Sequence, residues 1–429
     1  MPLEQQLDPD TPSTVHSLRV LGANITRKSF LDQLTRDIFR PQTLGQVFKE
    51  TRTLADELNR LDIFEEIRVY LDTQKQHPDH IDVTLQLKEK PRALVKTAVN
   101  AGYNDILLSE VALARNLFGG AEKAEINLTF GQRTKSAIEA IVSTPLNSPS
   151  TTLSAFVNTS IKDHSLFNAY QEKSDVAGVR LKVGSNVGDH SLTYAIARRN
   201  VTPFATASAT VQGQAGENNK SSLYHTWVHD TRDHPTVPRE GVYARLCQEW
   251  AGVGERGDEQ FFKTQATGQW HQRLNDSVTL SLTAQAGVLA ARQPDKVHVS
   301  DRLHLGGPLS VRGFQTAGID ANDGDNLGGN LYWTAGASLV SDLPGDAKAW
   351  PIKLHGFVNA GNMTSWQLGQ PPRAAVEDLQ QNARVSYGAG FIVYHAFGRL
   401  EANFCVPVQS RAGDRLAPGL QWGVGLHFL

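Results

Sequence analysis

The pattern of apolar and polar positions divides the chain into two parts near residue 90. In the first part, apolar residues recur at helical spacing in two segments and at every second position in three others. The helical segments are 26–40 and 44–61, and the alternating segments are 15–20, 67–71 and 81–87. The order strand, helix, helix, strand, strand predicts a small α+β module over residues 14–90, with its helices on one side of a sheet. Residues 1–13, with prolines and scattered acidic residues, predict a disordered tail.

After residue 90 the helical period disappears and strict alternation replaces it. The clearest alternating segments are 124–130, 278–288, 399–406 and 420–428. Segments of about 9–12 residues suit a tilted membrane crossing, and polar faces that mix small groups with charges suit a water-filled lumen. About fifteen to seventeen such segments fit between residues 91 and 429, at roughly 20 residues each. A soluble β-sandwich would also alternate, but length, polar faces and number together favour an all-β transmembrane barrel over 91–429.

Composition narrows the class of protein further. The chain has 42 Lys and Arg against 44 Asp and Glu, and a pI of about 6.7 gives no basic face for nucleic acid. Two cysteines, Cys247 and Cys405, cannot form a disulfide framework. A mean hydropathy of −0.33 argues only against a helical membrane protein, because a barrel hides its apolar residues at alternate positions. The acidic N-terminus fits neither a secretory signal nor a cleaved matrix presequence.

The sequence gives only weak support for a catalytic or metal-binding site. His229-Asp230, Asp233-His234 and the set His298, Asp301 and His304 resemble ligand clusters, but no spacing announces a tetrahedral site. The chain has no nucleophile elbow and no phosphate-binding glycine loop. We therefore expect no enzyme activity, no cofactor and no metal.

One long interruption of the strand pattern, residues 289–328, is rich in Gly, Asp and Pro. A loop of this length is expected to be either functional or disordered. It contains Val311-Arg312-Gly313-Phe314. Here the chain resembles the BamA-like outer-membrane protein assembly superfamily, also called the bacterial surface antigen family, in which this motif stands on a loop folded into the barrel lumen. Further resemblances are Asp230–Asp233 with Pro238–Gly241, Gly328–Asn330, and the N-terminal module, which matches the family's POTRA domain. The resemblance covers residues 15–429.

Within that superfamily the chain resembles the core barrel subunits of the mitochondrial sorting and assembly machinery (SAM), which have a single POTRA domain and no secretory signal. The similar segments are 357–362, 386–390, 403–407 and 426–429. The last strand also resembles a mitochondrial β-signal, with Gln421, Gly423, Leu426 and Phe428 at its defining positions. The resemblance implies sixteen strands in the mitochondrial outer membrane, with the POTRA domain in the intermembrane space.

The function implied by the resemblance is insertion of β-barrel precursors into that membrane. A precursor's β-signal would pair with the first strand at a lateral gate between the first and last strands. The expected gate residues are Val95, Lys96, Thr97, Ala98, Val99, Gln421, Gly423, Leu426 and Phe428. The glycines of the last strand either weaken the seam or only relieve crowding in the lumen. Implied partners are β-barrel precursors, metaxin-like SAM subunits, the MICOS cristae-junction complex and membrane lipid, with no nucleic acid.

Arg312 needs hydrogen-bond partners if it lies in a lumen. Bacterial relatives have acidic residues at the positions that correspond to Ser338 and Asn359, neither of which is charged here. Glu401, on the polar face of a later strand, is a candidate substitute by our own inference. We expect Arg312 to anchor the loop rather than to contact substrate. The POTRA domain has two open roles, since it would either guide precursors along a sheet edge or space and orient the barrel.

Three alternative functions compete with insertion. A passive solute pore needs neither an inward loop nor a POTRA domain, and a bacterial-type secretion transporter would require a signal peptide. A soluble all-β binding protein would be recovered without detergent. None of the three accounts for the motif, the Asp230–Gly241 segment and a single POTRA domain together.

Overall fold

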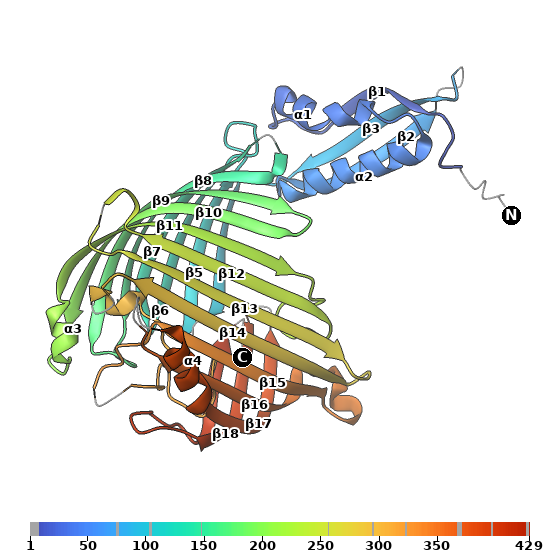
Figure 1. Ribbon diagram of the computed structural model, residues 1–429. Coiled ribbons are helices and arrows are strands. Elements are labelled where there is room, and N and C mark those ends of the chain that lie inside the picture. The colour runs from blue at the N-terminus through green and yellow to red at the C-terminus, as the bar shows by residue number, and fades with distance from the viewer. Residues whose placement is uncertain are drawn as a thin grey trace.

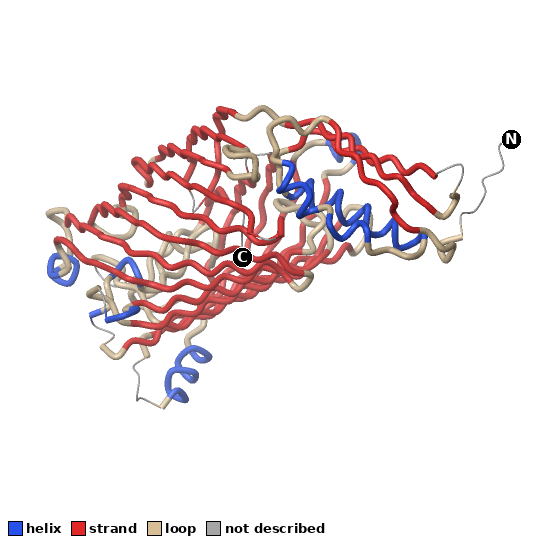
Figure 2. The backbone as a smooth tube through the Cα atoms, turned by 90° about the horizontal axis from the view of Figure 1, so that it is seen from above, coloured by secondary structure: helices blue, strands red, loops and turns tan. Residues whose placement is uncertain are grey.

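The chain forms a small N-terminal module beside one large curved β-sheet (Figure 1). The structure is a computed structural model that describes residues 8–73, 77–102, 105–146, 148–255, 257–293, 296–321, 324–366, 371–395, 398–425 and 429. Figure 2 shows the same arrangement from above, with the module beyond one end of the large sheet. Among these residues no helix is long and apolar enough to cross a membrane.

The N-terminal module has the element order that the sequence predicts. Its elements are β1 (Thr14–Leu21), α1 (Lys28–Leu34), η1 (Arg36–Phe39), α2 (Leu44–Arg60), β2 (Phe64–Thr73) and β3 (His80–Glu89). The sheet order is β1-β3-β2, with β1 parallel and β2 antiparallel to β3. Val47 and Leu58 of α2 belong to the same buried cluster as Val83 and Leu85 of β3. The helical and the alternating apolar positions therefore meet in one core.

Part of the expected N-terminal tail is ordered. The backbone N–H of Gly45 donates to the carbonyl of Pro9 at 2.8 Å, and that of Leu44 donates to Thr11 at 2.9 Å. These bonds satisfy donors in the first turn of α2 that have no partner within the helix. The segment directly before β1 is thus held against α2, although its composition alone predicted disorder.

The turn after β1 depends on a glycine, and this gives a stability prediction. Gly22 has φ +85°, and a Cβ built on it would lie 2.0 Å from the carbonyl oxygen of Leu87. We expect Gly22→Ala to destabilise the module by at least about 1–2 kcal/mol, because it combines a left-handed backbone with a steric clash. Hydrogen exchange of the β3 amides in the full chain would show the loss as faster exchange.

Gly213→Ala is a suitable control for the same substitution. Gly213 has no atom within 4 Å of its built Cβ, so we expect unchanged exchange in that variant. Equal exchange of β3 in wild type and Gly22→Ala would contradict the prediction.

The second part of the chain is a sixteen-stranded antiparallel sheet, which confirms the predicted all-β barrel class. Its first eight strands are β4 (Ala93–Gly102), β5 (Asp105–Arg115), β6 (Lys123–Gly131), β7 (Thr134–Leu146), β8 (Ser148–Asp163), β9 (Tyr170–Ser185), β10 (Gly188–Pro203) and β11 (Gly216–Asp230). The other eight are β12 (Gly241–Ala251), β13 (Phe261–Arg273), β14 (Val278–Ala291), β15 (Leu331–Asp342), β16 (Ile352–Thr364), β17 (Arg384–His395), β18 (Gly398–Gln409) and β19 (Gly419–Gly425). Each strand pairs with its neighbours in the sequence.

Short helices occupy several of the connections. They are α3 (Ala209–Gly213), η2 (Val253–Glu255), η4 (Val299–Asp301), η5 (Gly345–Ala349) and α4 (Pro372–Gln381). The carbonyl of Leu379 in α4 accepts hydrogen bonds from Trp333 and Asn362, so α4 lies against β15 and β16.

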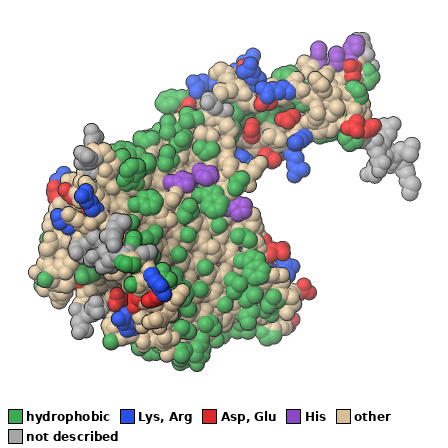
Figure 3. Space-filling model, in the orientation of Figure 1, with side chains coloured by type: hydrophobic (Ala, Val, Ile, Leu, Met, Phe, Trp, Pro, Cys, Tyr) green, Lys and Arg blue, Asp and Glu red, His purple; other side chains and the backbone are tan. Residues whose placement is uncertain are grey.

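The alternation of the sequence becomes two faces of the curved sheet. Exposed apolar residues such as Trp270, Leu282 and Val358 point outward, and Figure 3 shows hydrophobic side chains spread over the outer wall. Polar residues such as Asn359 and Glu401 are buried on the inner face. Because side chains alternate along a strand, one polar and one apolar face follow from period two.

The first and last strands do not pair with each other in the described part of the chain. The sheet order runs from β19 to β4 without closing, although β4 lies beside β18 and β19. Among the described residues, β4 therefore has a free edge at this seam. The last strand, expected over 420–428, is described as far as Gly425, and residues 426–428 lie outside the described residues.

Candidate functional site

The connection between β14 and β15 is the longest between barrel strands. β14 continues to Ala291 and β15 begins at Leu331, so this motif loop comprises residues 292–330, slightly displaced from the expected 289–328. Side chains on the loop contact buried side chains of the inner wall, as described below. The loop therefore folds into the lumen.

Each side of the motif is fixed by its own physical requirement. Val311 and Phe314 are fully buried and share an apolar cluster with Leu289, Tyr332 and Leu429. Between them the backbone at residue 313 has φ +84°, a conformation that favours glycine, and a built Cβ would lie only 3.3 Å from the Ser386 Cβ. The apolar pair thus holds the hairpin in place, and the glycine allows its tight turn.

Arg312 is buried and is held by several partners. Its Nε donates to Oε2 of Glu401 at 3.0 Å, and Nη2 lies 2.9 Å from the same oxygen. Its Nη1 donates to Oδ1 of Asn359 at 3.0 Å and to the carbonyl oxygen of Leu429 at 2.8 Å. The guanidinium also lies over the ring of Phe357, 4.7 Å from the centroid. The structure thus brings Glu401 and Asn359, two of the three expected partners, onto Arg312.

The third expected partner, Ser338, is one step removed from the guanidinium. Its hydroxyl lies 3.1 Å from Nε2 of His355, and Nδ1 of His355 lies 3.0 Å from Oδ1 of Asn403. Nδ2 of Asn403 then donates to Oε2 of Glu401 at 2.7 Å. Ser338 therefore contributes to the network around Glu401 through His355 and Asn403, not by contact with Arg312.

Glu401 has a second cationic neighbour that the sequence reasoning missed. Arg399 forms an ion pair with Oε1 of Glu401 from the same inward face of β18. Arg399 stands two residues before Glu401 in an alternating strand, and this spacing already places both charges on the same face. Across the ladder, Glu401 pairs with Gly423, which adds no side chain beside the carboxylate. This position favours the interpretation that Gly423 relieves crowding in the lumen.

The motif loop is also tied to the last hairpin of the barrel. The N–H of Gly313 donates to Oε1 of Gln421 at 3.0 Å, and Nε2 of Gln421 donates to the carbonyl of Phe314 at 2.7 Å. The connection between β18 and β19 adds backbone bonds, with Gln315 N–H to the Arg415 carbonyl at 2.9 Å. Gln421, an expected gate residue, thus faces the loop and fixes β19 to it.

A second anchor holds the beginning of the motif loop against the opposite wall. Asp301 accepts from Nη1 of Arg199 at 2.7 Å and from Nζ of Lys220 at 2.6 Å. Lys220 also donates to Glu249 at 2.9 Å, and Glu249 lies 3.1 Å from Nζ of Lys263. Asp301 was considered as a metal ligand from the sequence, but here it neutralises two buried cations of β10 and β11. The sequence pattern does not reveal this cluster, because its charges come from four different strands and from the loop.

The other histidines of the suspected ligand clusters have separate surroundings. His298 accepts from the N–H of Ser300 at 3.2 Å and caps η4, while His304 lies against the ring of Phe167. His229 stacks on Trp227, and His234 accepts from the N–H of Thr236 at 3.2 Å. In the described ranges no three His, Cys, Asp or Glu side chains are grouped so that they could hold a metal ion.

The expected gate residues of the first strand lie on the free edge. Val95 and Val99 are exposed on the outer face with Thr97, while Lys96 and Ala98 alternate with them. All five pair with β5 on one side only, as far as the described strands show. Of the expected residues on the last strand, Leu426 and Phe428 lie outside the described residues.

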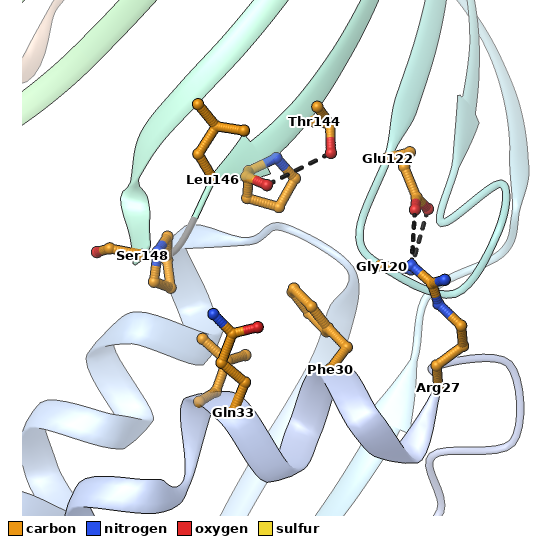
Figure 4. A pocket seen from close by; sticks show the side chains of 11 residues that line it. Arg27, Phe30, Gln33, Gly120, Glu122, Thr144, Leu146 and Ser148 are labelled. Atoms are coloured by element: carbon orange, nitrogen blue, oxygen red, sulfur yellow. Dashed lines mark hydrogen bonds and ion pairs between the residues drawn. The ribbon is translucent and has the colours of Figure 1, made fainter.

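The N-terminal module contacts the barrel at the ends of β5, β6 and β7. Arg27 forms an ion pair with Glu122 at 3.2 Å, and its N–H donates to the carbonyl of Gly119 at 2.8 Å. A cavity of about 260 Å³ lies beside this contact. Figure 4 shows its lining, with Phe30 and Gln33 on the side of α1 and Leu146 on the side of the barrel. The module is thus fixed near the strands that lead to the seam.

Asp62 gives this contact a dependence on pH. Partial burial raises the pKa of Asp62, but the hydrogen bond from Lys90 and the charges of Lys123 and Arg115 outweigh it, so the pKa is lowered. A lowered pKa stabilises the docked state above the ordinary Asp pKa of about 3.9, and this contribution is lost as the pH falls through the lowered value. We expect energy transfer between dyes on α2 and the β7–β8 turn to stay constant from pH 7 to about 5 and to fall below about 4.

Asp62→Asn serves as the control for that titration. The neutral amide cannot titrate, so this variant should show weaker docking and a smaller fall below about pH 4 than wild type. The fall that remains comes from Glu122, which pairs with Arg27 in the same contact and whose pKa is also lowered. Identical titrations of the variant and wild type would contradict the assignment to Asp62.

A curved sixteen-stranded sheet, an inward motif loop and an attached α+β module define the class of outer-membrane assembly barrels. Residues 116–428 match the family model described as the Omp85 superfamily domain. A SAM50-like protein of Schizosaccharomyces pombe is 32% identical over 437 residues, which cover 97% of this chain and 91% of the relative. The human sorting and assembly machinery component 50 homolog is 30% identical over 409 residues, which cover 92% and 86%. The chain belongs to the Omp85 superfamily, among its SAM50 homologues.

The fold is similar to that of solved bacterial barrels. BamA from Haemophilus ducreyi lacking POTRA domains 1–3 aligns with a TM-score of 0.76 at 15% identity, covering 96% of this chain and 84% of the other. CdiB from Acinetobacter baumannii aligns with a TM-score of 0.57 at 13% identity, covering 96% and 73%. At these identities the likeness supports the fold alone.

Proposed function

We propose that the protein inserts β-barrel precursors into the mitochondrial outer membrane by pairing their β-signals with the free edge of β4. The human relative is named as a sorting and assembly machinery component and the S. pombe relative as a SAM50-like protein. These names support a role in β-barrel assembly rather than bond-changing catalysis. The observation that carries the proposal is the unpaired edge of β4 beside β18 and β19. The module would lie in the intermembrane space as a POTRA domain.

Backbone chemistry explains why a free edge would capture a precursor. An unpaired N–H or C=O in hydrocarbon costs several kcal/mol, so an unfolded precursor cannot enter lipid strand by strand. The edge of β4 presents such groups, and an added antiparallel strand satisfies those of both partners. Residues 95–99 would form the pairing surface, with Val95, Thr97 and Val99 facing lipid.

The two sides of the seam differ in how they are held. Gln421 and Glu401 bind the motif loop, and Asp301 binds the loop to the opposite wall, so β18 and β19 are braced from inside. The hydrogen bonds described for the loop go to the β8–β9 connection and to elements from β9 to β19. β4 and β5, in contrast, continue toward the module. In the proposed mechanism β18 and β19 stay fixed, while β4–β7 move outward with the module to admit the precursor.

The proposed partners follow from the same assignment. Precursors of porin and import-pore type would bind β4, metaxin-like SAM subunits would bind the assembled barrel, and the MICOS complex would bind on the intermembrane-space side. With one module, both roles stay open for the POTRA domain, as a guide for precursors or as a spacer.

Disulfide trapping tests the proposal. Single cysteines would be placed at residues 95–99 in a chain with Cys247→Ala and Cys405→Ala, and a porin precursor would have one cysteine in its β-signal. We expect crosslinks with a fixed register and a two-residue period, because paired strands alternate. A cysteine replacing Leu282, on the outer face of β14, is the control and should capture no precursor.

Failure to trap the precursor at all of residues 95–99 would contradict insertion at β4. Solute flux without capture would instead support a passive pore. The side chains that fill the lumen around Arg312 argue against that alternative, since a pore does not need a buried ion pair inside its channel.

A further inference from the structure

A polar cluster lies on the outer wall of the barrel, where lipid is expected. It consists of His190 on β10, His225 on β11 and Gln248 on β12. His225 is directly opposite Gln248 in the ladder and opposite Leu192 on its other side. Leu192 is 45% exposed, and residues directly opposite each other share a face. Figure 3 shows histidine side chains among hydrophobic ones on this wall.

The residues around His225 are apolar. Along β11, His225 stands between Leu223 and Trp227, in the middle third of the strand. Across the ladder these two residues pair with Trp250 and Leu246 of β12. His190 is the third residue of β10, close to the turn from β9. Acyl chains have no hydrogen-bonding groups, so lipid packed around His225 cannot satisfy polar side chains there.

The three side chains form a hydrogen-bonded chain with two open ends. Nδ1 of His225 lies 3.0 Å from Oε1 of Gln248, and Nε2 of His225 lies 3.2 Å from Nδ1 of His190. An amide oxygen only accepts, so His225 donates to Gln248 and must accept from His190. This leaves Nε2 of His190 as an acceptor and the amide N–H groups of Gln248 as donors. Reversing the amide would exchange these roles and still leave one donor and one acceptor.

We infer that this cluster is a docking site for a membrane-embedded segment of a second protein that presents a hydroxyl or carboxamide side chain. Ser, Thr, Asn and Gln side chains both donate and accept, so one such group or a neighbouring pair satisfies both open ends. Interfaces inside membranes are enriched in these residues for the same reason. The inference concerns a wall distant from the proposed gate and does not depend on precursor pairing at β4.

The first test separates docking from a role in holding the strands together. The full chain and the triple variant His190→Leu, His225→Leu and Gln248→Leu would be compared in phosphatidylcholine vesicles with no other protein. If the cluster is a partner site, its removal from a lipid-facing wall should shift the urea midpoint upward. A downward shift would show that the cluster stabilises the barrel itself and would overturn the inference.

The second test identifies the occupant. A photo-crosslinking amino acid replaces Leu223, beside the cluster, in membranes of cells that produce the protein, with Leu282 of β14 as the control position. We expect an adduct at 223 whose crosslinked peptide is a membrane-embedded segment with Ser, Thr, Asn or Gln. His190→Leu with Gln248→Leu should reduce that adduct at least fivefold.

Three outcomes of the second test would overturn the inference. They are an adduct with lipid only, an adduct with a second copy of this chain, and an adduct of equal yield at residue 282 or in the leucine variants. Because insertion of precursors is measured separately by trapping at β4, failure here leaves the proposed function unaffected.

Discussion

Replacing Arg312 by alanine is expected to destabilise the barrel by about 3–5 kcal/mol and to prevent precursor assembly. The change leaves Glu401 buried without the cation that holds two of its contacts, and it frees Asn359 and the carbonyl of Leu429. It also detaches the motif hairpin from β16 and β18. The midpoint of urea unfolding in detergent and the yield of assembled porin precursor would measure the two effects.

Two other variants sharpen the test of Arg312. Arg312→Lys keeps the charge but lacks the planar fork that spans Glu401 and Asn359, so it should keep part of the stability. Arg273→Ala removes an exposed partner of Glu240 at 3.9 Å, and such surface pairs contribute little. Equal midpoints for Arg312→Ala and Arg273→Ala would refute the anchoring role.

Asp301→Asn is expected to cost about 3 kcal/mol or more, because it removes the charge that neutralises Arg199 and Lys220 in a buried site. The beginning of the motif loop would then separate from β10 and β11 while Arg312 still holds its tip. Urea unfolding would report the lost stability, and limited proteolysis would report cleavage within residues 292–300.

The control for Asp301→Asn is a variant that breaks an ion pair exposed to solvent. Glu217→Gln breaks the exposed ion pair with Arg198 on neighbouring strands, and we expect no measurable change there. If Asp301→Asn behaved like Glu217→Gln, with an uncleaved loop and an unchanged midpoint of urea unfolding, the contacts of Asp301 would contribute nothing measurable to stability.

The anchors show where sequence reasoning reached its limit. Glu401 was selected because a charge on the polar face of an apolar strand needs a partner, and it lies on Arg312 from 89 positions away. Ser338 was placed by correspondence with other barrels, yet it reaches the network only through His355. Asp301 was weighed as a metal ligand because the sequence shows its neighbours along the chain and not the cations of β10 and β11.

The sequence by itself determined the alternating strands, their number within one or two, the small α+β module and the glycine-bearing motif on a long loop. Those features are local, because periodicity and backbone conformation depend on residues within one strand or turn. Only the tertiary structure decided the free edge of β4 among the described strands, which of the expected partners contact Arg312, the partners of Asp301, and the outward cluster at His225. Each of these features depends on which residues of distant strands lie beside each other and on whether the sheet closes. Strand register and the path of the loop determine this, and neither is encoded in the pattern of a single strand.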